Sequence, residues 1–206
     1  IRRPPRSTLF PYTTIFRSLT TEEKKLLLQI ARLTIENYLG SGQVPQIDTD
    51  KHPILKQQSG AFVTLHKSGN LRGCIGYIIS DDYLYETIHN AAIQAAFHDP
   101  RFPAVKKHEL QNIEIEISIL SRPFKMNSYD DIVIGEHGLI VTEYGRRGLL
   151  LPQVPIEHNM DKWEYLSSLC VKAGLPENLW QQKTLNIEMF TATVFSESEL
   201  EVKDER

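Results

Sequence analysis

The clearest pattern in the chain is an alternation of apolar and polar residues from position 113 to 119. Four isoleucines alternate there with polar residues in the order IEIEISI. Because successive side chains of a β-strand point to opposite faces, this period of two predicts a strand with one buried face.

Further strands are predicted on both sides of this segment. Two apolar runs at 61–65 and 71–79 flank the polar residues 67–70, which predicts a β-hairpin. Later strands are expected at 132–134 and 139–142 around a tight turn, at 149–151 after a turn over 145–148, and at 187–195.

Apolar residues at helical spacing predict a first helix that begins after Thr20. The spacing of Thr20 and Glu23 is that of a capping box, and Gly40 or Gly42 would end the helix.

Two more helices follow from the same period. One would begin at Asp81 or Asp82 and reach about residue 97, and the other would begin at Asp161 and end near residue 174. Helices interspersed with hairpins predict an α+β fold with a mostly antiparallel sheet flanked by helices. The length suits one domain or two tightly associated lobes.

The two ends of the chain differ from its middle. Residues 1–18 contain four arginines, three prolines and no acids, and they resemble translated sequencing-adapter sequence. We interpret them as a non-native, disordered segment; the alternative is a genuine basic tail that would indicate anionic partners. Residues 198–206 are mostly charged and are expected to fray.

Charge and composition restrict the class of protein. The whole chain has a net charge of −3, which becomes −7 once residues 1–18 and their four arginines are left out. This acidic balance disfavours nucleic-acid binding. No apolar run approaches the ~20 residues of a membrane span, and two cysteines do not make a disulfide framework. With no signal-peptide pattern, the expected location is the cytoplasm.

The segment LRGCIG at 71–76 is the strongest candidate site. Gly73 and Gly76 weaken a strand, so they indicate a bulge or the close approach of a backbone or a ligand. Cys74 between them is a candidate nucleophile or proton donor. On a regular strand Arg72 would share its face and lower the pKa of the thiol. The alternative is that Cys74 is a small buried apolar residue.

Five other residues are weaker candidates. Arg101 is a candidate clamp for a carboxylate or phosphate, oriented by Asp99, although an Asp–Arg pair also suits a purely structural corner. His137 is a candidate acid or base on a turn, or else a solvated residue. Arg147 is a candidate anion ligand, and Gln153 is placed to aim its amide into a cleft. Neither a metal site nor a particular cofactor is predicted from these spacings.

Five segments carry a resemblance to a known family. GAFVTL, LRGCIG, DPRFP, HGLIV and RGLLLPQVP occur in the order expected of the AMMECR-type domain, also called AmmeMemoRadiSam system protein A. The chain resembles this family over residues 19–197, as a single domain with LRGCIG as its hallmark.

The resemblance implies an association with a Memo-type protein and a radical-SAM protein. In an enzyme pathway of that kind, the expected catalytic groups are Cys74, Arg72, and His137 or Asp99. The alternative function is a non-catalytic adaptor that binds a peptide or a small ligand. Convergence of Cys74, Arg72 and a histidine or aspartate in one concave pocket would favour the enzyme.

Overall fold

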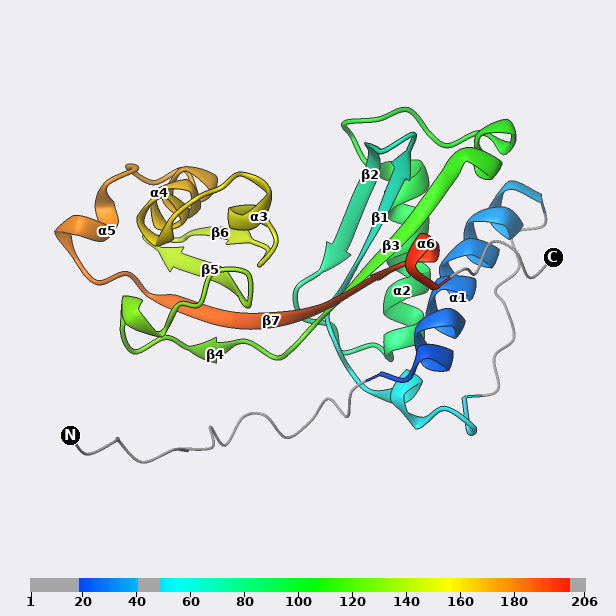
Figure 1. Cartoon of the computed structure of the whole chain (residues 1–206), viewed down its shortest axis with the longest axis horizontal. Helices are drawn as coiled ribbons and strands as arrows, with labels where there is room; N and C mark the ends of the chain where they lie inside the picture. The colour runs from blue at the N-terminus through cyan, green and yellow to red at the C-terminus, as the bar shows by residue number, and fades with distance from the viewer. Residues whose placement is uncertain (1–18, 41–48, 201–206) are drawn as a thin grey trace, which may run out of the picture.

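A single antiparallel sheet organises the computed structural model, which describes residues 19–40 and 49–200 (Figure 1). The sheet has seven strands in the order β2-β1-β3-β7-β5-β6, and β4 also pairs with β7. The strands are β1 (Ala61–Lys67), β2 (Asn70–Tyr77), β3 (Ile113–Leu120), β4 (Phe124–Lys125), β5 (His137–Glu143), β6 (Arg146–Leu150) and β7 (Ile187–Ser196).

Helices of several kinds flank this sheet. The α-helices are α1 (Thr21–Gly40), α2 (Leu84–Ile93), α3 (Val154–Glu157), α4 (Lys162–Lys172), α5 (Leu179–Gln182) and α6 (Glu197–Leu200). The 3-10 helices are η1 (Pro53–Lys56), η3 (Lys107–Asn112) and η4 (Tyr129–Asp131), and η2 (Gln94–His98) is a π-helix that continues α2. The predicted α+β class is therefore confirmed.

The molecule has two lobes that share β7 (Figure 1). Residues 192–196 of β7 pair with β3 in the first lobe, and residues 187–191 pair with β5 in the second. The first lobe carries α1 and α2, whereas the second carries α3, α4 and α5 (Figure 1). One strand thus connects two separate hydrophobic cores.

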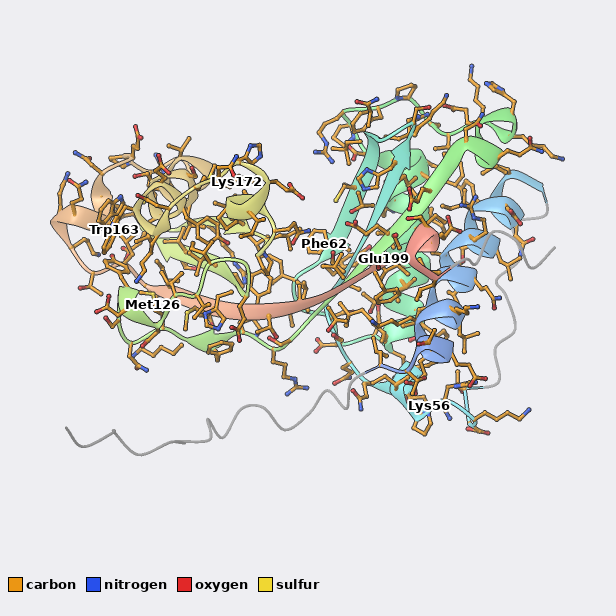
Figure 2. All side chains as sticks on the ribbon, viewed as in Figure 1. Lys56, Phe62, Met126, Trp163, Lys172 and Glu199 are labelled. Atoms are coloured by element: carbon orange, nitrogen blue, oxygen red, sulfur yellow. The ribbon has the colours of Figure 1, made fainter. Side chains whose placement is uncertain are left out.

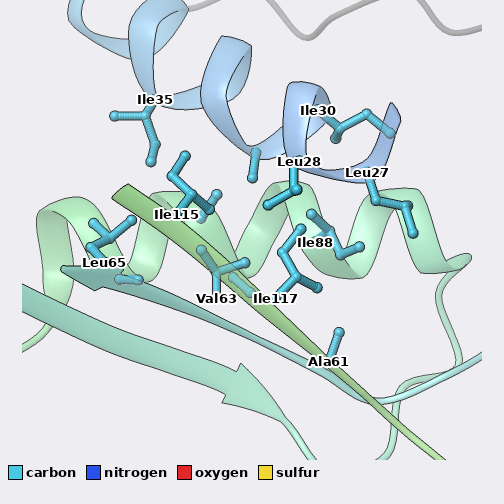
Figure 3. Packing of buried hydrophobic residues seen from close by; sticks show 14 of the residues in the cluster. Leu27, Leu28, Ile30, Ile35, Ala61, Val63, Leu65, Ile88, Ile115 and Ile117 are labelled. Carbon is cyan, nitrogen blue, oxygen red and sulfur yellow. The ribbon is translucent and has the colours of Figure 1, made fainter. Parts of the chain in front are cut away.

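The core of the first lobe lies between α1, α2 and one face of β1 and β3 (Figure 3). All four isoleucines of the alternating segment are at most 2% exposed, which confirms the predicted strand and its buried face. Burial of each such side chain contributes roughly 2 kcal/mol to folding, so the alternation itself anchors β3 under the helices.

The predicted start signals of the first and last long helices are confirmed. The amide of Glu23 donates to Thr20 Oγ1 over 3.2 Å, and the amide of Thr20 donates back to the Glu23 carboxylate. Asp161 accepts hydrogen bonds from the amides of Trp163 and Glu164. The first helix ends at Gly40, and Gly42 lies outside the described residues.

The predicted start of the second helix is wrong by one or two residues. Its N-cap is Tyr83, whose amide donates to Glu86. Asp82 instead donates its amide to Ser80 Oγ in the preceding turn, so neither acidic residue caps the helix.

Two predicted features around the second hairpin are also wrong. Residues 132–134 form no strand, because the carbonyl of Val133 accepts the amides of Glu136 and His137 and closes a local turn. His137 then begins β5 instead of lying on the turn. The next turn consists of Tyr144 and Gly145, so the two arginines after it already belong to β6.

The C-terminal segment is ordered further than expected. Glu197 begins α6 and is 1% exposed, and it accepts hydrogen bonds from the guanidinium of Arg32 and from the amide of Ile115. Residues 198–200 of the segment that was expected to fray thus complete α6. The predictions for 1–18 and 201–206 lie outside the described residues and stay predictions.

A third apolar cluster lies where the two lobes meet, on the face of the sheet opposite the helices. Its buried members are Leu120, Ile140 and Phe190, and it includes partly buried Phe62, Ile78, Leu149, Leu151 and Ala192. Phe62 marks this junction in Figure 2. Further along β1, β2 and β3, the same face of the sheet carries polar side chains, and the candidate site lies there.

Candidate functional site

One rung of the sheet brings Cys74 together with two polar residues. Val63 and Leu65 of β1 are fully buried under the helices, so Thr64 between them points to the opposite, helix-free face. Thr64 pairs with Cys74 of β2 on one side and with Glu116 of β3 on the other. The thiol, the hydroxyl and the carboxylate therefore form a row across three strands.

The thiol of Cys74 is held in a fixed position but is not activated. Thr64 Oγ1 donates a hydrogen bond to Cys74 Sγ over 3.3 Å. Partial burial raises the pKa of the Cys74 thiol, and the Thr64 hydrogen bond and the charge of Arg101 offset this only in part. Cys74 is therefore protonated at neutral pH, where it acts as a soft contact or weak donor more readily than as a nucleophile.

Asp99 and Arg101 clamp the backbone of Cys74 at the edge of the sheet. The Cys74 amide donates to Asp99 Oδ2 over 2.9 Å, and Arg101 Nη2 donates to the Cys74 carbonyl over 3.0 Å. Arg101 also donates to both oxygens of Asp99, which holds the pKa of this buried carboxyl far below its usual range. Together the two side chains satisfy edge groups of β2 that would otherwise be open to pairing.

Arg72 does not share the environment of Cys74, contrary to the prediction from a regular strand. Leu65 pairs with Gly73 and His66 pairs with Leu71, so Arg72 is the extra residue of a β-bulge. Its guanidinium binds Glu109 through Nε and Nη2 over 3.2 and 3.1 Å. Arg101, and not Arg72, is the cation that acts on the thiol.

The two glycines of LRGCIG make room for the protein itself. A Cβ on Gly73 would collide with the carbonyl oxygen of Ala95, where the π-helical turn η2 approaches β2. A Cβ on Gly76 would collide with the carbonyl of Ala61 and with Phe62. The space beside both glycines is thus filled by the protein's own atoms, which leaves no room there for a ligand.

His137 lies far from Cys74, in the second lobe. It pairs with Thr191 of β7, whereas the rung of Cys74 reaches β7 at Ser196, about 16 Å further along the strand. His137 Nδ1 accepts the amide of Val133, and the ring packs edge-on against Phe124. The structure therefore does not bring His137 and Cys74 together.

The remaining two predicted residues belong to the second lobe. Arg147 is exposed on β6. Gln153 is the N-cap residue of α3, and its side-chain oxygen Oε1 is buried with no hydrogen-bond partner among the described residues.

Glu109, Glu116 and Ser118 were not predicted as site residues. The alternation at 113–119 already placed Glu116 and Ser118 on the face away from the core, and this signal could have found them. The partnership of Glu109 with Arg72 depends on a bulge, which no periodicity reveals.

The described residues show no metal site or membrane span, and a cavity in the second lobe lies away from the candidate site. They contain no group of three or more His, Cys, Asp or Glu side chains placed to hold a metal. None of the helices within residues 19–40 and 49–200 is both long and apolar enough to cross a membrane. An open cavity of about 420 Å³ lies in the second lobe beside Glu143 and Lys183, and none of the predicted site residues lines it.

The fold and the clamped LRGCIG strand define a two-lobed α+β protein with a shared central strand. The AMMECR1 family pattern matches residues 28–195, and the chain belongs to this family. It is 42% identical to a protein of Methanosarcina mazei over 88% of this chain and 94% of that protein. It is 47% identical to a protein of Methanococcus aeolicus over 87% and 93% of the two chains.

A solved structure has the same architecture. The crystal structure of uncharacterized protein PH0010 from Pyrococcus horikoshii is similar with a TM-score of 0.77 and 38% sequence identity. The similarity covers 84% of this chain and 90% of that one. The predicted family resemblance is thereby confirmed.

Proposed function

We propose that the protein is a binding module that takes a small ligand on the helix-free face, at the rung formed by Cys74, Thr64 and Glu116. The supporting observation is the fixed position of the Cys74 thiol. Its side chain accepts a hydrogen bond from Thr64, and its backbone is held by Asp99 and Arg101. Such preorganisation lowers the entropic cost of binding without making the thiol nucleophilic.

In this proposal the Memo-type and radical-SAM proteins are the partners that carry out chemistry on the bound ligand. The module supplies position through the LRGCIG strand, and the partners supply the reactive groups. Co-purification of the three proteins, compared between wild type and Cys74→Ser, tests this arrangement. Equal recovery with both variants, in the presence and absence of a protein-free cell extract, would remove the link between the site and the partners.

Protection of Cys74 from alkylation tests the binding site itself. Native protein is treated with iodoacetamide with and without a protein-free cell extract, and the labelling of each cysteine is followed by mass spectrometry. We expect the extract to slow the labelling of Cys74, because a ligand on the rung covers the sulfur. Cys170, which is 0% exposed in the second core, serves as the control within the same molecule.

Two outcomes would count against a binding module. An unchanged rate at Cys74 would show that no extract component covers the rung. Turnover of an extract component by wild type and not by Cys74→Ser, with Cys170→Ser as the matched control, would favour an enzyme instead.

A further inference from the structure

Three side chains near the junction of the lobes carry oxygens that have no hydrogen-bond partner among the described residues. Glu116 makes no side-chain hydrogen bond or ion pair with any residue in 19–40 or 49–200, although it is partly buried. Within the same residues, Ser118 Oγ and Gln153 Oε1 are buried and likewise lack a hydrogen-bond partner. Unpartnered buried polar groups cost free energy, so the Ser118 and Gln153 oxygens and the half-buried Glu116 carboxylate call for a functional explanation.

The two acceptors on β3 lie on one face of the sheet. Glu116 and Ser118 are two residues apart on a regular strand, so both point to the helix-free side. Ser118 is only 1% exposed, and it pairs with Phe62 of β1 and Val194 of β7. The hydroxyl therefore sits directly above the apolar cluster between the lobes.

Gln153 belongs to the second lobe, at the start of a helix whose neighbours in sequence reach the first lobe. Leu151, two residues before it, belongs to the apolar cluster that contains Phe62, the cross-strand partner of Ser118. Glu157 lies one helical turn after Gln153, and its charge acts on the carboxyl of Glu116. Figure 1 shows α3 on the side of the second lobe that faces β1 and β2.

The electrostatic surroundings favour a cation. Burial raises the pKa of Glu116; the charge of His66 lowers it, and those of Glu157, Glu199 and Glu114 raise it further. A bound positive charge would relieve this repulsion and restore an ordinary carboxylate.

We propose that Glu116, Ser118 Oγ and Gln153 Oε1 together bind a primary ammonium group, so that the ligand of the proposed binding module is an amine. An ammonium carries three N–H donors and no acceptor, which matches three unpartnered oxygens of which one carries a charge. This inference rests on the proposed function, since it assigns the chemistry of the ligand at that site. Two strand spacings separate Glu116 from Cys74, so the ligand extends about 10 Å from its amine to the thiol.

Methylammonium chloride is the probe, and tetramethylammonium chloride is its control at equal ionic strength. Both are monovalent cations, but only methylammonium can donate N–H hydrogen bonds. We expect calorimetric titration to detect methylammonium binding to wild type and none for tetramethylammonium. Glu116→Gln should weaken binding at least tenfold, Ser118→Ala should weaken it several-fold, and Glu177→Gln, at an exposed acid of the second lobe, should leave it unchanged.

A second measurement separates a binding role from a structural one. Without amine, Glu116→Gln and Ser118→Ala should raise the melting temperature or leave it unchanged, because the first removes an unpaired charge and the second removes an unsatisfied hydroxyl. Melting temperatures below that of wild type, or equal binding of the two cations, would overturn the ammonium site.

The alkylation assay distinguishes failure of this inference from failure of the proposed function. If methylammonium does not bind while the cell extract still protects Cys74, the ammonium site is wrong and the binding module stands. If neither methylammonium nor the extract has an effect, both are wrong.

Discussion

The two hairpins at opposite edges of the sheet are built alike, yet only one carries the candidate site. Each turns through a non-glycine residue in the left-handed region followed by glycine: Ser68–Gly69 in β1–β2 and Tyr144–Gly145 in β5–β6. This pair of positive φ angles is that of a tight two-residue hairpin turn. Each second strand also places a glycine against a helix, Gly73 against η2 and Gly148 against the end of α4.

The hairpins differ on the face that no helix covers. In β5–β6 that face carries the apolar pair Ile140 and Leu149, which belong to the cluster between the lobes, and only Thr142 and Arg147 next to the turn are polar. In β1–β2 the same face carries Thr64 and Cys74, and side chains from the loop after η2 hold the outer edge. The turns and the glycines packed against helices are therefore a frame that both hairpins share. Thr64 and Cys74, held by Asp99 and Arg101, are found in the first hairpin alone.

Substitution of the frame glycines should have the largest effects and should affect both hairpins. Gly73→Ala is expected to lose about 3 kcal/mol of folding stability, because the new methyl meets a backbone carbonyl that has no room to move. Gly148→Ala meets the backbone of Ala173 at 2.7 Å and should lose somewhat less. Urea denaturation measures both. Gly40→Ala is the control and should lose almost nothing, because the added methyl would meet no other part of the described residues within 4 Å.

Removal of the bulge partner should affect the first hairpin alone. Glu109→Gln leaves the guanidinium of Arg72, which is 9% exposed, without its counter-charge, and about 3 kcal/mol of stability should be lost. Arg146 of the second hairpin is exposed and donates to the carbonyl of Gly174, so Arg146→Ala should cost less than about 1 kcal/mol. Similar losses of unfolding free energy in both variants would mean that the Arg72–Glu109 ion pair stabilises the fold no more than the surface contact of Arg146.

The same ion pair predicts a pH dependence with a definite sign. Arg72 above all lowers the pKa of Glu109 to about 2, from an ordinary value of 4.5. A depressed pKa stabilises the folded state above pH 4.5, and this contribution is lost as the pH falls toward 2. The difference in unfolding free energy between wild type and Glu109→Gln should therefore shrink over that interval. A constant difference from pH 6 to pH 2 would contradict the assignment.

Loosening the clamp should have a smaller and more local effect. Asp99→Asn removes a buried charge that accepts from the Cys74 amide and from Arg101, and it should cost about 2 kcal/mol. Hydrogen exchange at the Cys74 amide should accelerate, while that at Leu149 in the second hairpin should not. Asp130→Asn, at an exposed ion pair with Lys162, is the control and should cost close to nothing.

The smallest effect concerns reactivity rather than stability. Iodoacetamide should label Cys74 before Cys170, because Cys74 is partly exposed and Cys170 is fully buried. Burial raises the pKa of both thiols, so the rate at Cys74 should still rise with pH above neutrality instead of levelling off. A plateau near pH 7 would show an activated thiolate and favour the enzyme.

The sequence was sufficient for elements whose signal is local. The alternation in β3, the capping box at Thr20, the helix start at Asp161 and the 67–70 turn each depend on a few neighbouring residues, and the sequence predicted all of them. The start of α2 was misplaced because Asp81 and Asp82 have cap-forming side chains that the structure does not use for a cap.

The site was harder to predict because its contacts join distant segments. The spacing of Arg72 and Cys74 predicts that both side chains lie on one face of the strand. The β-bulge instead turns Arg72 toward Glu109. Asp99 and Arg101 were seen as a pair, yet their contact with the Cys74 backbone crosses 25 residues or more of chain. Glu116 was noted only as the polar half of a pattern, because the approach of α3 from the second lobe cannot be read from spacing.

The sharing of β7 also bears on the order in which the protein is completed during translation. Both lobes need this strand, which follows every other strand of the sheet in the sequence, and the first lobe is complete only when Glu197 reaches Arg32. Neither lobe can therefore complete its sheet before β7 is in place. Two cores that look independent are thus expected to assemble, and to be lost, as one cooperative unit.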